Sequence, residues 1–147
     1  MKKLNWGILS TAKIGIEKVI PAMQHGKLSK IVAIASRTHE SAREAAKNLK
    51  IPKAFGSYKD LLEDTSIDAV YIPLPNHMHV PWTIKALAAD KHVLCEKPLS
   101  RKLTESEEMI QIAKEMGVTL KCGFNHRHHP AITEGKKIID EIYKHKK

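Results

Sequence analysis

The sequence predicts an α/β fold in which helices enclose a doubly wound parallel sheet of about six strands. Two observations predict it. Short apolar runs recur along the chain, and each is followed by a segment whose apolar residues have helical spacing. Strands that alternate with helices pair in parallel, because each helix carries the chain back to the edge where the previous strand began. Right-handed crossovers then predict the strand order 3-2-1-4-5-6.

The apolar runs define the expected strands, which are Leu4–Leu9, Ile31–Ala35, Lys53–Phe55, Ala69–Ile72, His92–Cys95 and Val118–Phe124. The second run is continuously aliphatic, as in a strand buried on both faces. The fourth run stops at Pro73, which cannot donate to a sheet.

Helical spacing defines the expected helices, which are Ile14–Gln24, Glu40–Leu49, 57–62, Val80–Ala89, 104–116 and Pro130–Lys144. Thr38 and Ser57 are expected N-caps, and Thr104 with Glu107 forms an expected capping box. We expect Pro21 to kink or shorten the first helix and Pro81 to lie in the first turn of the fourth. Gly117 is expected to end the fifth.

Composition limits the classes of protein to consider. The chain is 42% hydrophobic and 28% charged over 147 residues, which predicts one globular domain. No apolar stretch is long enough to span a membrane, and the N-terminus has no signal region, so a cytoplasmic protein is expected. The net charge of +9 comes from scattered lysines without interleaved aromatic residues, so nucleic acid is not an expected partner.

Neither cysteine nor histidine shows the spacing of a metal site. Cys95 and Cys122 lie in separate apolar runs, where we expect free, buried thiols. His126, His128 and His129 have no cysteine or carboxylate beside them at ligand spacing, so no bound metal is expected.

The segment after the first expected strand has the spacing of a phosphate-binding turn. Ser10, Ala12 and Gly15 occupy the three positions of the G-x-G-x-x-G pattern, and such small residues still let the backbone approach a pyrophosphate. The N–H groups that begin the next helix would then face an anion. An ordinary tight turn is the alternative, and the alternation of strand and helix around it favours the phosphate-binding interpretation.

The end of the second expected strand indicates which dinucleotide would bind. An NAD site usually has an acidic residue here, about 20 residues after the glycines. This sequence has Ser36 and Arg37 instead, and hydroxyl and guanidinium groups suit the 2′-phosphate of NADP. NAD remains possible, and a surface arginine beside a helix cap is the alternative interpretation of Arg37.

Two further strand ends carry polar groups. Pro73 and Pro75 stiffen the loop after the fourth strand, which presents Asn76 and His79 to the same crevice. Glu96-Lys97-Pro98 ends the fifth strand. A partly desolvated lysine at this position can donate a proton or hydrogen-bond a substrate oxygen, whereas a structural ion pair is the alternative.

In this order, the motifs resemble the N-terminal half of the Gfo/Idh/MocA oxidoreductases, a family that includes glucose–fructose oxidoreductase and dimeric dihydrodiol dehydrogenase. The similar segments are 6–15, 19–22, 35–37, 71–79 and 96–98, and the resemblance covers nearly the whole chain. It implies a Rossmann domain, a nicotinamide dinucleotide, and reversible hydride transfer between a sugar- or diol-type alcohol and its ketone.

The resemblance also implies a role for each matched residue. The pyrophosphate is expected on the turn formed by Ser10, Thr11, Ala12, Lys13, Ile14 and Gly15. The adenosine ribose and its phosphate are expected at Ser36 and Arg37, and the middle of the cofactor at Leu74, Pro75, Asn76 and His79. The nicotinamide end is expected at Glu96, Lys97 and Arg127, with Lys97 as the candidate catalytic lysine.

Members of the family continue into a second domain that holds the substrate site and a catalytic histidine with its aspartate partner. We therefore expect a dinucleotide-binding domain at 1–127 and, at 128–147, a helix that begins the crossover to a domain absent from these residues. Three hypotheses follow: an enzyme completed by another subunit, a non-catalytic NADP-binding module or truncated relic, and a protein that self-associates. Substrate turnover by the chain alone is expected to be negligible, and a homo-oligomer is expected.

Overall fold

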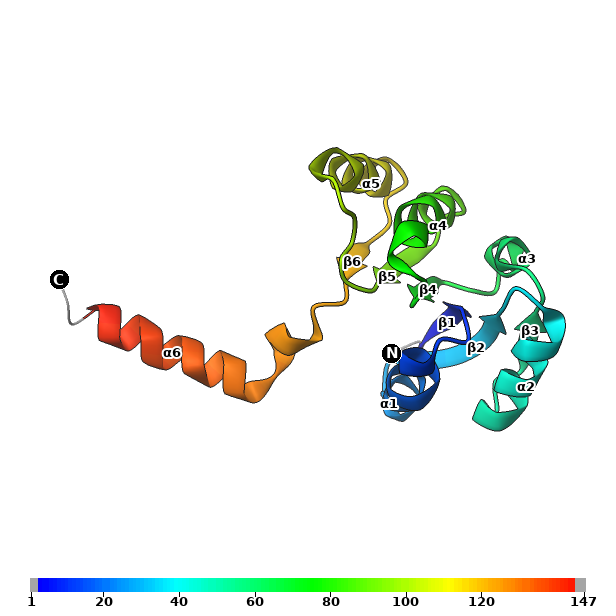
Figure 1. Ribbon diagram of the computed structural model, residues 1–147, viewed down its shortest axis with the longest axis horizontal. Coiled ribbons are helices and arrows are strands. Elements are labelled where there is room, and N and C mark those ends of the chain that lie inside the picture. The colour runs from blue at the N-terminus through cyan, green and yellow to red at the C-terminus, as the bar shows by residue number, and fades with distance from the viewer. Residues whose placement is uncertain (1–2, 145–147) are drawn as a thin grey trace.

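The computed structural model describes residues 3–144 and contains one parallel sheet with the strand order β3-β2-β1-β4-β5-β6 (Figure 1). Its strands are β1 (Leu4–Leu9), β2 (Ser29–Ala35), β3 (Lys53–Phe55), β4 (Ala69–Ile72), β5 (His92–Cys95) and β6 (Leu120–Cys122). The predicted fold class and strand order are therefore confirmed. The last strand is shorter than predicted, because the chain leaves the sheet at Gly123.

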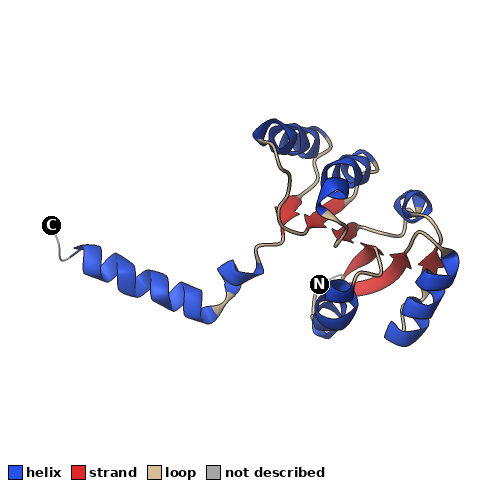
Figure 2. Ribbon diagram, in the orientation of Figure 1, coloured by secondary structure: helices blue, strands red, loops and turns tan. Residues whose placement is uncertain are grey.

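Helices cover both faces of the sheet (Figure 2). One face carries α1 (Ile20–His25) and α2 (His39–Leu49). The other face carries α3 (Tyr58–Glu63), α4 (Asn76–Ala88) and α5 (Leu103–Glu115). This division follows from the right-handed crossovers, because the sheet grows from β1 in both directions.

Alternate residues of the central strands fill two separate cores. Ile8, Ile34 and Tyr71 are fully buried with the helices α1 and α2. Leu9 and Ile72 are fully buried on the opposite face. Each such side chain contributes about 1.5–3 kcal/mol of burial free energy, so the sheet forms a rigid platform for the loops at its edge.

Local sequence signals account for three of the helix ends. The Oγ1 atom of Thr38 accepts a hydrogen bond from the N–H of Ser41 at 3.3 Å, and Ser57 caps α3 in the same way, so both predicted caps are confirmed. Gly117 has a φ of +67° directly after α5 and its C-cap residue, the left-handed conformation that ends a helix.

Two predicted helix starts were wrong. Helix α4 begins at Asn76 rather than at residue 80, because Pro75 serves as its N-cap, and Pro81 therefore lies inside the helix. Helix α5 begins at Leu103 with Lys102 as its N-cap, so Thr104 is already helical and forms no capping box. The hydroxyl of Ser106 instead lies 2.6 Å from that of Ser100 in the preceding loop.

The first predicted helix is divided by a change of hydrogen-bond register. A π-helical turn, η1 (Gly15–Val19), precedes α1, and the N–H of Ile20 donates to the carbonyl of Gly15. The change comes directly before Pro21, whose ring nitrogen has no hydrogen to donate. Pro21 does not end the helix, which continues to His25, so the predicted shortening is not observed and the change of register is the irregularity found here.

The chain leaves the sheet through the 3₁₀ turn η2 (Asn125–His128) and the helix α6 (Pro130–Lys144). Figure 1 shows α6 extending away from the sheet, and none of its residues is buried. Among the described residues, no helix is both long and apolar enough to cross a lipid bilayer.

Candidate dinucleotide and catalytic site

The predicted site residues come from distant parts of the sequence but follow the carboxyl ends of β1, β2, β4, β5 and β6. These ends meet along one edge of a parallel sheet, which is where ligands bind in doubly wound folds. The edge therefore brings five polar loops together around the switch point between β1 and β4.

The turn after β1 has an unusual backbone at Ser10. Its φ of +138° lies in the region that favours glycine, at the position of the first glycine of the phosphate-binding pattern. The N–H of Ser10 donates to the carbonyl of Ala35 at 3.0 Å, and its Oγ atom accepts from the N–H of Ala12 at 2.9 Å. The hydroxyl thus stabilises the turn from within, which offsets the strain of the serine backbone.

Gly15 is buried where the first helical segment crosses the sheet. A Cβ atom at this position would lie 3.5 Å from Cγ of Pro73, an ordinary van der Waals distance. The protein core therefore leaves room for a methyl group here. Two neighbouring residues point outward, since Ile14 is 51% exposed and the amino group of Lys13 lies 3.9 Å from Glu17 on the surface.

The ends of β1 and β2 present two hydroxyl groups to one another. The Oγ1 atom of Thr11 lies 3.4 Å from Oγ of Ser36, and Ser36 is held by a hydrogen bond from its N–H to the carbonyl of Phe55. Arg37 is exposed beside this pair. Burial raises the pKa of the nearby Tyr58, and the positive charge of Arg37 partly offsets that rise.

A pocket of about 480 Å³ lies between the ends of β4, β5 and β6 and the start of the first helical segment. It is lined by Ile14, Pro73, Leu74, Asn76, His79, Glu96, Lys97, Gly123, Phe124, Asn125 and His126. Six of the predicted site residues therefore share one cavity. Pro75 does not line it, because that residue caps α4 and faces solvent.

Glu96 is held at this pocket by a buried phenol. The hydroxyl of Tyr71 donates to Oε1 of Glu96 at 2.8 Å, and burial, followed by Glu96 itself, raises the pKa of Tyr71 far above its ordinary value. The loop after β6 approaches closely, because a Cβ atom at Gly123 would lie only 3.3 Å from Oε2 of Glu96. The carboxylate is thereby fixed in orientation at the floor of the cavity.

Lys97 is exposed at the mouth of the same pocket, next to this carboxylate. Its backbone N–H faces Oε2 of Glu96 at 3.4 Å. Within residues 3–144 its amino group forms no salt bridge or side-chain hydrogen bond, so the alternative of a structural ion pair is not supported. An ammonium group placed in this way can reach a ligand oxygen in the cavity.

His79 is almost fully buried, and both of its ring nitrogens are engaged. Nδ1 lies 2.7 Å from the carbonyl oxygen of Pro98, and Nε2 lies 2.7 Å from that of Leu74. His79 is among the residues that line the pocket, and its ring nitrogens join two loops. The neighbouring Asn76 is exposed, so its amide remains available to a ligand.

Arg127 lies in η2, outside the residues that line the pocket. Its guanidinium carbon lies 5.5 Å from the centre of the Phe124 ring, as in a cation–π contact. Sequence reasoning named Arg127 but missed its neighbours Asn125 and His126, which do line the cavity. Their position directly after the sixth strand was the signal that could have identified them.

The part of the chain from β1 to β6 matches a known family. Residues 4–124 match the family described as "Oxidoreductase family, NAD-binding Rossmann fold", Gfo/Idh/MocA. The chain belongs to the Gfo/Idh/MocA oxidoreductase family. Its sheet is the NAD-binding Rossmann domain of that family, as the sequence motifs predicted.

Several relatives of known name support this assignment. The chain is 44% identical to D-xylose 1-dehydrogenase (NADP(+)) 2 of Haloferax volcanii over 91% of its own length and 41% of that protein. It is 35% identical to trans-1,2-dihydrobenzene-1,2-diol dehydrogenase of Xenopus tropicalis over 92% and 42% of the two chains. The chain thus spans about two-fifths of the length of these Gfo/Idh/MocA proteins.

A solved structure agrees in its fold as well. KijD10, a 3-ketoreductase from Actinomadura kijaniata crystallised with NADP and TDP-benzene, is 34% identical with a TM-score of 0.92. The similarity covers 95% of this chain and 43% of KijD10. The Rossmann domain described here is therefore the part that this chain shares with complete reductases of the Gfo/Idh/MocA family.

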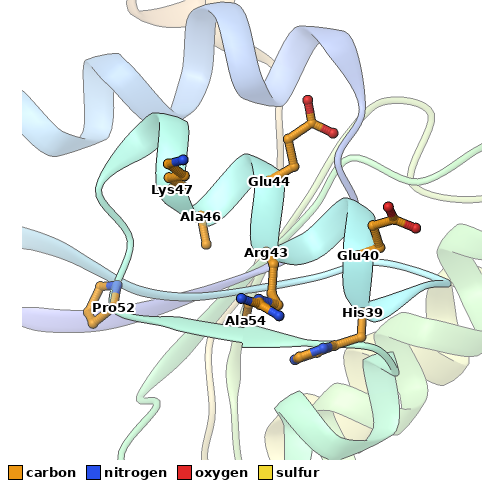
Figure 3. Close-up of a pocket in the computed structure, with 8 residues that line it drawn as sticks. All are labelled: His39, Glu40, Arg43, Glu44, Ala46, Lys47, Pro52 and Ala54. Carbon is orange, nitrogen blue, oxygen red and sulfur yellow. The ribbon is translucent and has the colours of Figure 1, made fainter.

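A larger hollow, of about 900 Å³, lies between α2 and β3 (Figure 3). Its lining combines acidic and basic side chains with the apolar Ala46, Pro52 and Ala54. None of the residues that the Gfo/Idh/MocA motifs single out lines it. It is a groove at the outer edge of the sheet, away from the strand ends that meet at β1 and β4.

Both cysteines of this Gfo/Idh/MocA domain are free thiols, as predicted. Cys95 is fully buried, and burial raises its pKa to about 12. Cys122 is only partly buried, which corrects the prediction that both are core residues, because β6 is an edge strand with one open side. Among the described residues, no group of three or more potential ligands could hold a metal ion.

Proposed function

We propose that this chain binds NADP(H) as the cofactor domain of an oxidoreductase that interconverts a sugar- or diol-type alcohol and its ketone. One observation carries the choice of NADP. The hydroxyl groups of Thr11 and Ser36 meet at the ends of β1 and β2 beside the exposed guanidinium of Arg37, and the two residues directly after β2 are not acidic. That donor set suits a 2′-phosphate, whereas an NAD site would hold an acid there. NAD is the weaker alternative ligand.

The other donors suit the remaining parts of the dinucleotide. Proposed pyrophosphate contacts come from the turn after β1, comprising Ser10, Thr11, Ala12, Lys13, Ile14 and Gly15. The N–H of Ala12 already donates to the Ser10 hydroxyl, so the next helix N–H groups, those of Lys13 and Ile14, are the proposed anion donors. Further contacts are proposed from Leu74, Pro75, Asn76, His79, Glu96, Lys97 and, at the rim, Arg127.

Lys97 is the proposed catalytic residue. Its exposed amino group lies at the mouth of the pocket beside Glu96, where it can hydrogen-bond the substrate oxygen and exchange the alcohol proton. The nicotinamide, when bound, supplies or accepts the hydride. Glu96, whose carboxylate Tyr71 orients, keeps a negative charge near the lysine. Relatives named for xylose and for dihydrobenzene diol support an alcohol of this class.

The proposal divides the chain at residue 127, with a dinucleotide-binding domain at 1–127 and a connecting segment at 128–147. The helix of that segment is α6 (Pro130–Lys144), and residues 145–147 lie outside the described residues. The pocket beside Lys97 is open to solvent, since Lys97, Asn76 and His126 are all exposed. A substrate of sugar size needs a second wall there, which another domain or subunit would supply. We therefore propose that the 147 residues bind NADPH without appreciable turnover.

Fluorescence titration of the purified chain with NADPH and NADH tests the binding proposal. We expect NADPH to bind at least about tenfold more tightly, because a charge-assisted hydrogen bond is worth about 1.5–3 kcal/mol. Equal affinities would contradict the assignment to NADP. Reduction of NADP by a panel of sugars and diols should be negligible, and robust turnover would contradict the need for a second wall.

A second candidate function is self-association of this NADP-binding module. The observation that favours it is the apolar surface of α6, where Ile132, Ile138, Ile139, Ile142 and Tyr143 are each more than half exposed. A contiguous apolar surface of this kind is typical of an interaction site. Light scattering at increasing protein concentration tests it, and a monomer throughout would contradict it.

A further inference from the structure

His79 presents an unusual arrangement, because each nitrogen of a nearly fully buried ring faces an acceptor. The ring is 1% exposed, and the carbonyl oxygens of Leu74 and Pro98 lie 2.7 Å from Nε2 and Nδ1. A carbonyl oxygen carries no proton, so each contact is a hydrogen bond only if the nitrogen donates. Neutral imidazole has one N–H group. Only the doubly protonated ring satisfies both contacts.

The two carbonyls belong to different loops of the pocket. Leu74 follows β4 and precedes Asn76, whereas Pro98 follows Lys97 at the end of β5. We infer that His79 is a positioning residue whose imidazolium ring ties these two loops together and thereby fixes Lys97 at the pocket. This inference rests on the proposed function only where it places the nicotinamide end of the cofactor beside Lys97.

The chemistry of the surroundings supports a charged ring. Hydrogen bonds from a charged donor are shorter and stronger than neutral ones, which fits two contacts of 2.7 Å. The carboxylate of Glu96 lines the same pocket. A ring that donated only once would leave one buried carbonyl facing a nitrogen lone pair, which is repulsive.

The spectrum of the wild-type chain tests the protonation state directly. With 15N-labelled histidine, we expect the ring of His79 to show two N–H signals at neutral pH, assigned through their proximity to Leu74 and Pro98. A single ring N–H, with the second nitrogen unprotonated, would overturn the inference. This measurement requires neither a variant nor a bound ligand.

The substitution His79→Gln tests the positioning role, with His77→Gln as the matched control. His77 is exposed in the first turn of the same helix and does not line the pocket. We expect H79Q to weaken NADPH binding about tenfold, since it removes a charge-assisted hydrogen bond that orders the loops, and H77Q to weaken it less than twofold.

A second ligand separates a local effect from a general loss of structure. Adenosine 2′,5′-bisphosphate contains the half of NADPH proposed to bind near Arg37 and the turn after β1 but lacks the nicotinamide end, so H79Q should change its affinity less than twofold. Equal weakening of both ligands, or no weakening of NADPH, would overturn the positioning role. If the wild-type chain binds neither ligand, the proposed function fails, and the histidine spectrum still decides whether His79 carries two protons.

Discussion

The hydroxyl of Tyr71 donates a hydrogen bond of 2.8 Å to Oε1 of Glu96, and so connects the interior of the sheet to the pocket at its edge. Tyr71 is fully buried in β4, whereas Glu96 is partly exposed at the end of β5. Burial and the neighbouring carboxylate both raise the pKa of Tyr71, so the phenol keeps its proton and remains a donor over the whole neutral range.

The substitution Tyr71→Phe should lower the free energy of unfolding at pH 8 by about 1 kcal/mol, the typical loss for one hydrogen bond. Above pH 10 the tyrosine ionises in the unfolded chain but not in the folded one, so wild-type stability falls as pH rises. The variant lacks the tyrosine hydroxyl, so its free energy of unfolding should fall less as pH rises. Urea unfolding at pH 8 and 10.5 should show the difference narrowing, and a constant difference would contradict the raised pKa.

The substitution Arg37→Glu should reduce the affinity for NADPH at least about tenfold more than that for NADH, because it replaces a phosphate donor by a repelling charge. Arg43→Glu is the matched control. It makes the same change of charge in the groove between α2 and β3 (Figure 3). Titration of both variants with both cofactors measures the effect. Equal losses of the two cofactors in R37E would argue against a phosphate contact.

The substitution Gly15→Ala separates folding from binding. A methyl group at this position meets its nearest heavy atom at 3.5 Å, so the melting temperature should be unchanged or slightly higher. If the pyrophosphate lies on this turn, the same methyl group should hinder it and weaken NADPH binding. Calorimetry and fluorescence titration give the two results. Unchanged NADPH affinity would place the pyrophosphate elsewhere.

The substitution Asp64→Asn should destabilise the chain at pH 7 by about 1 kcal/mol, in the range of a partly exposed ion pair. The Lys53 amino group at 2.6 Å, followed by Ser66, lowers the pKa of Asp64 to about 2. Because the pKa of Asp64 is lower in the folded chain than in the unfolded chain, its carboxylate stabilises the folded state above pH 4. This stabilisation is lost as pH falls to about 2 and the carboxylate takes up a proton. Unfolding curves of the two proteins should therefore converge between pH 4 and 2. Parallel curves would contradict the ion pair.

The double substitution Ile138→Glu and Ile142→Glu should shift any oligomer toward monomer, because it places charge on the apolar side of α6. Both side chains are more than half exposed, so the fold of the sheet should be unaffected. Thr133→Glu adds charge to an exposed residue on another side of the same helix and serves as the control. Light scattering should separate the variants, and equal masses would argue against this surface.

Much of the fold could be predicted because its signals are local. The run Ala69–Ile72 and the caps Thr38 and Ser57 can each be recognised within a few residues. The start of α5 could not be predicted in this way, because its N-cap is Lys102, which makes no side-chain capping bond, rather than Thr104.

The sequence also predicted which candidate residues would lie together. Strand ends identified Glu96 and Lys97, since the carboxyl ends of parallel strands meet at one edge. The partners of those residues depend on contacts across the sheet. The sequence shows that His79 is near the crevice, but only the fold reveals that both of its nitrogens meet carbonyl groups. The bond from Tyr71 to Glu96 spans 25 residues and has no local signature.

The π-helical turn Gly15–Val19 constrains how this segment can change during evolution. Ile14, before the turn, lines the pocket, while Ile20, after it, is fully buried in the core. Each residue of a regular helix advances it by about 100°, so deleting one residue from this turn would rotate one of these side chains away from its environment. A one-residue deletion would therefore remove either Ile14 from the cavity wall or Ile20 from the core.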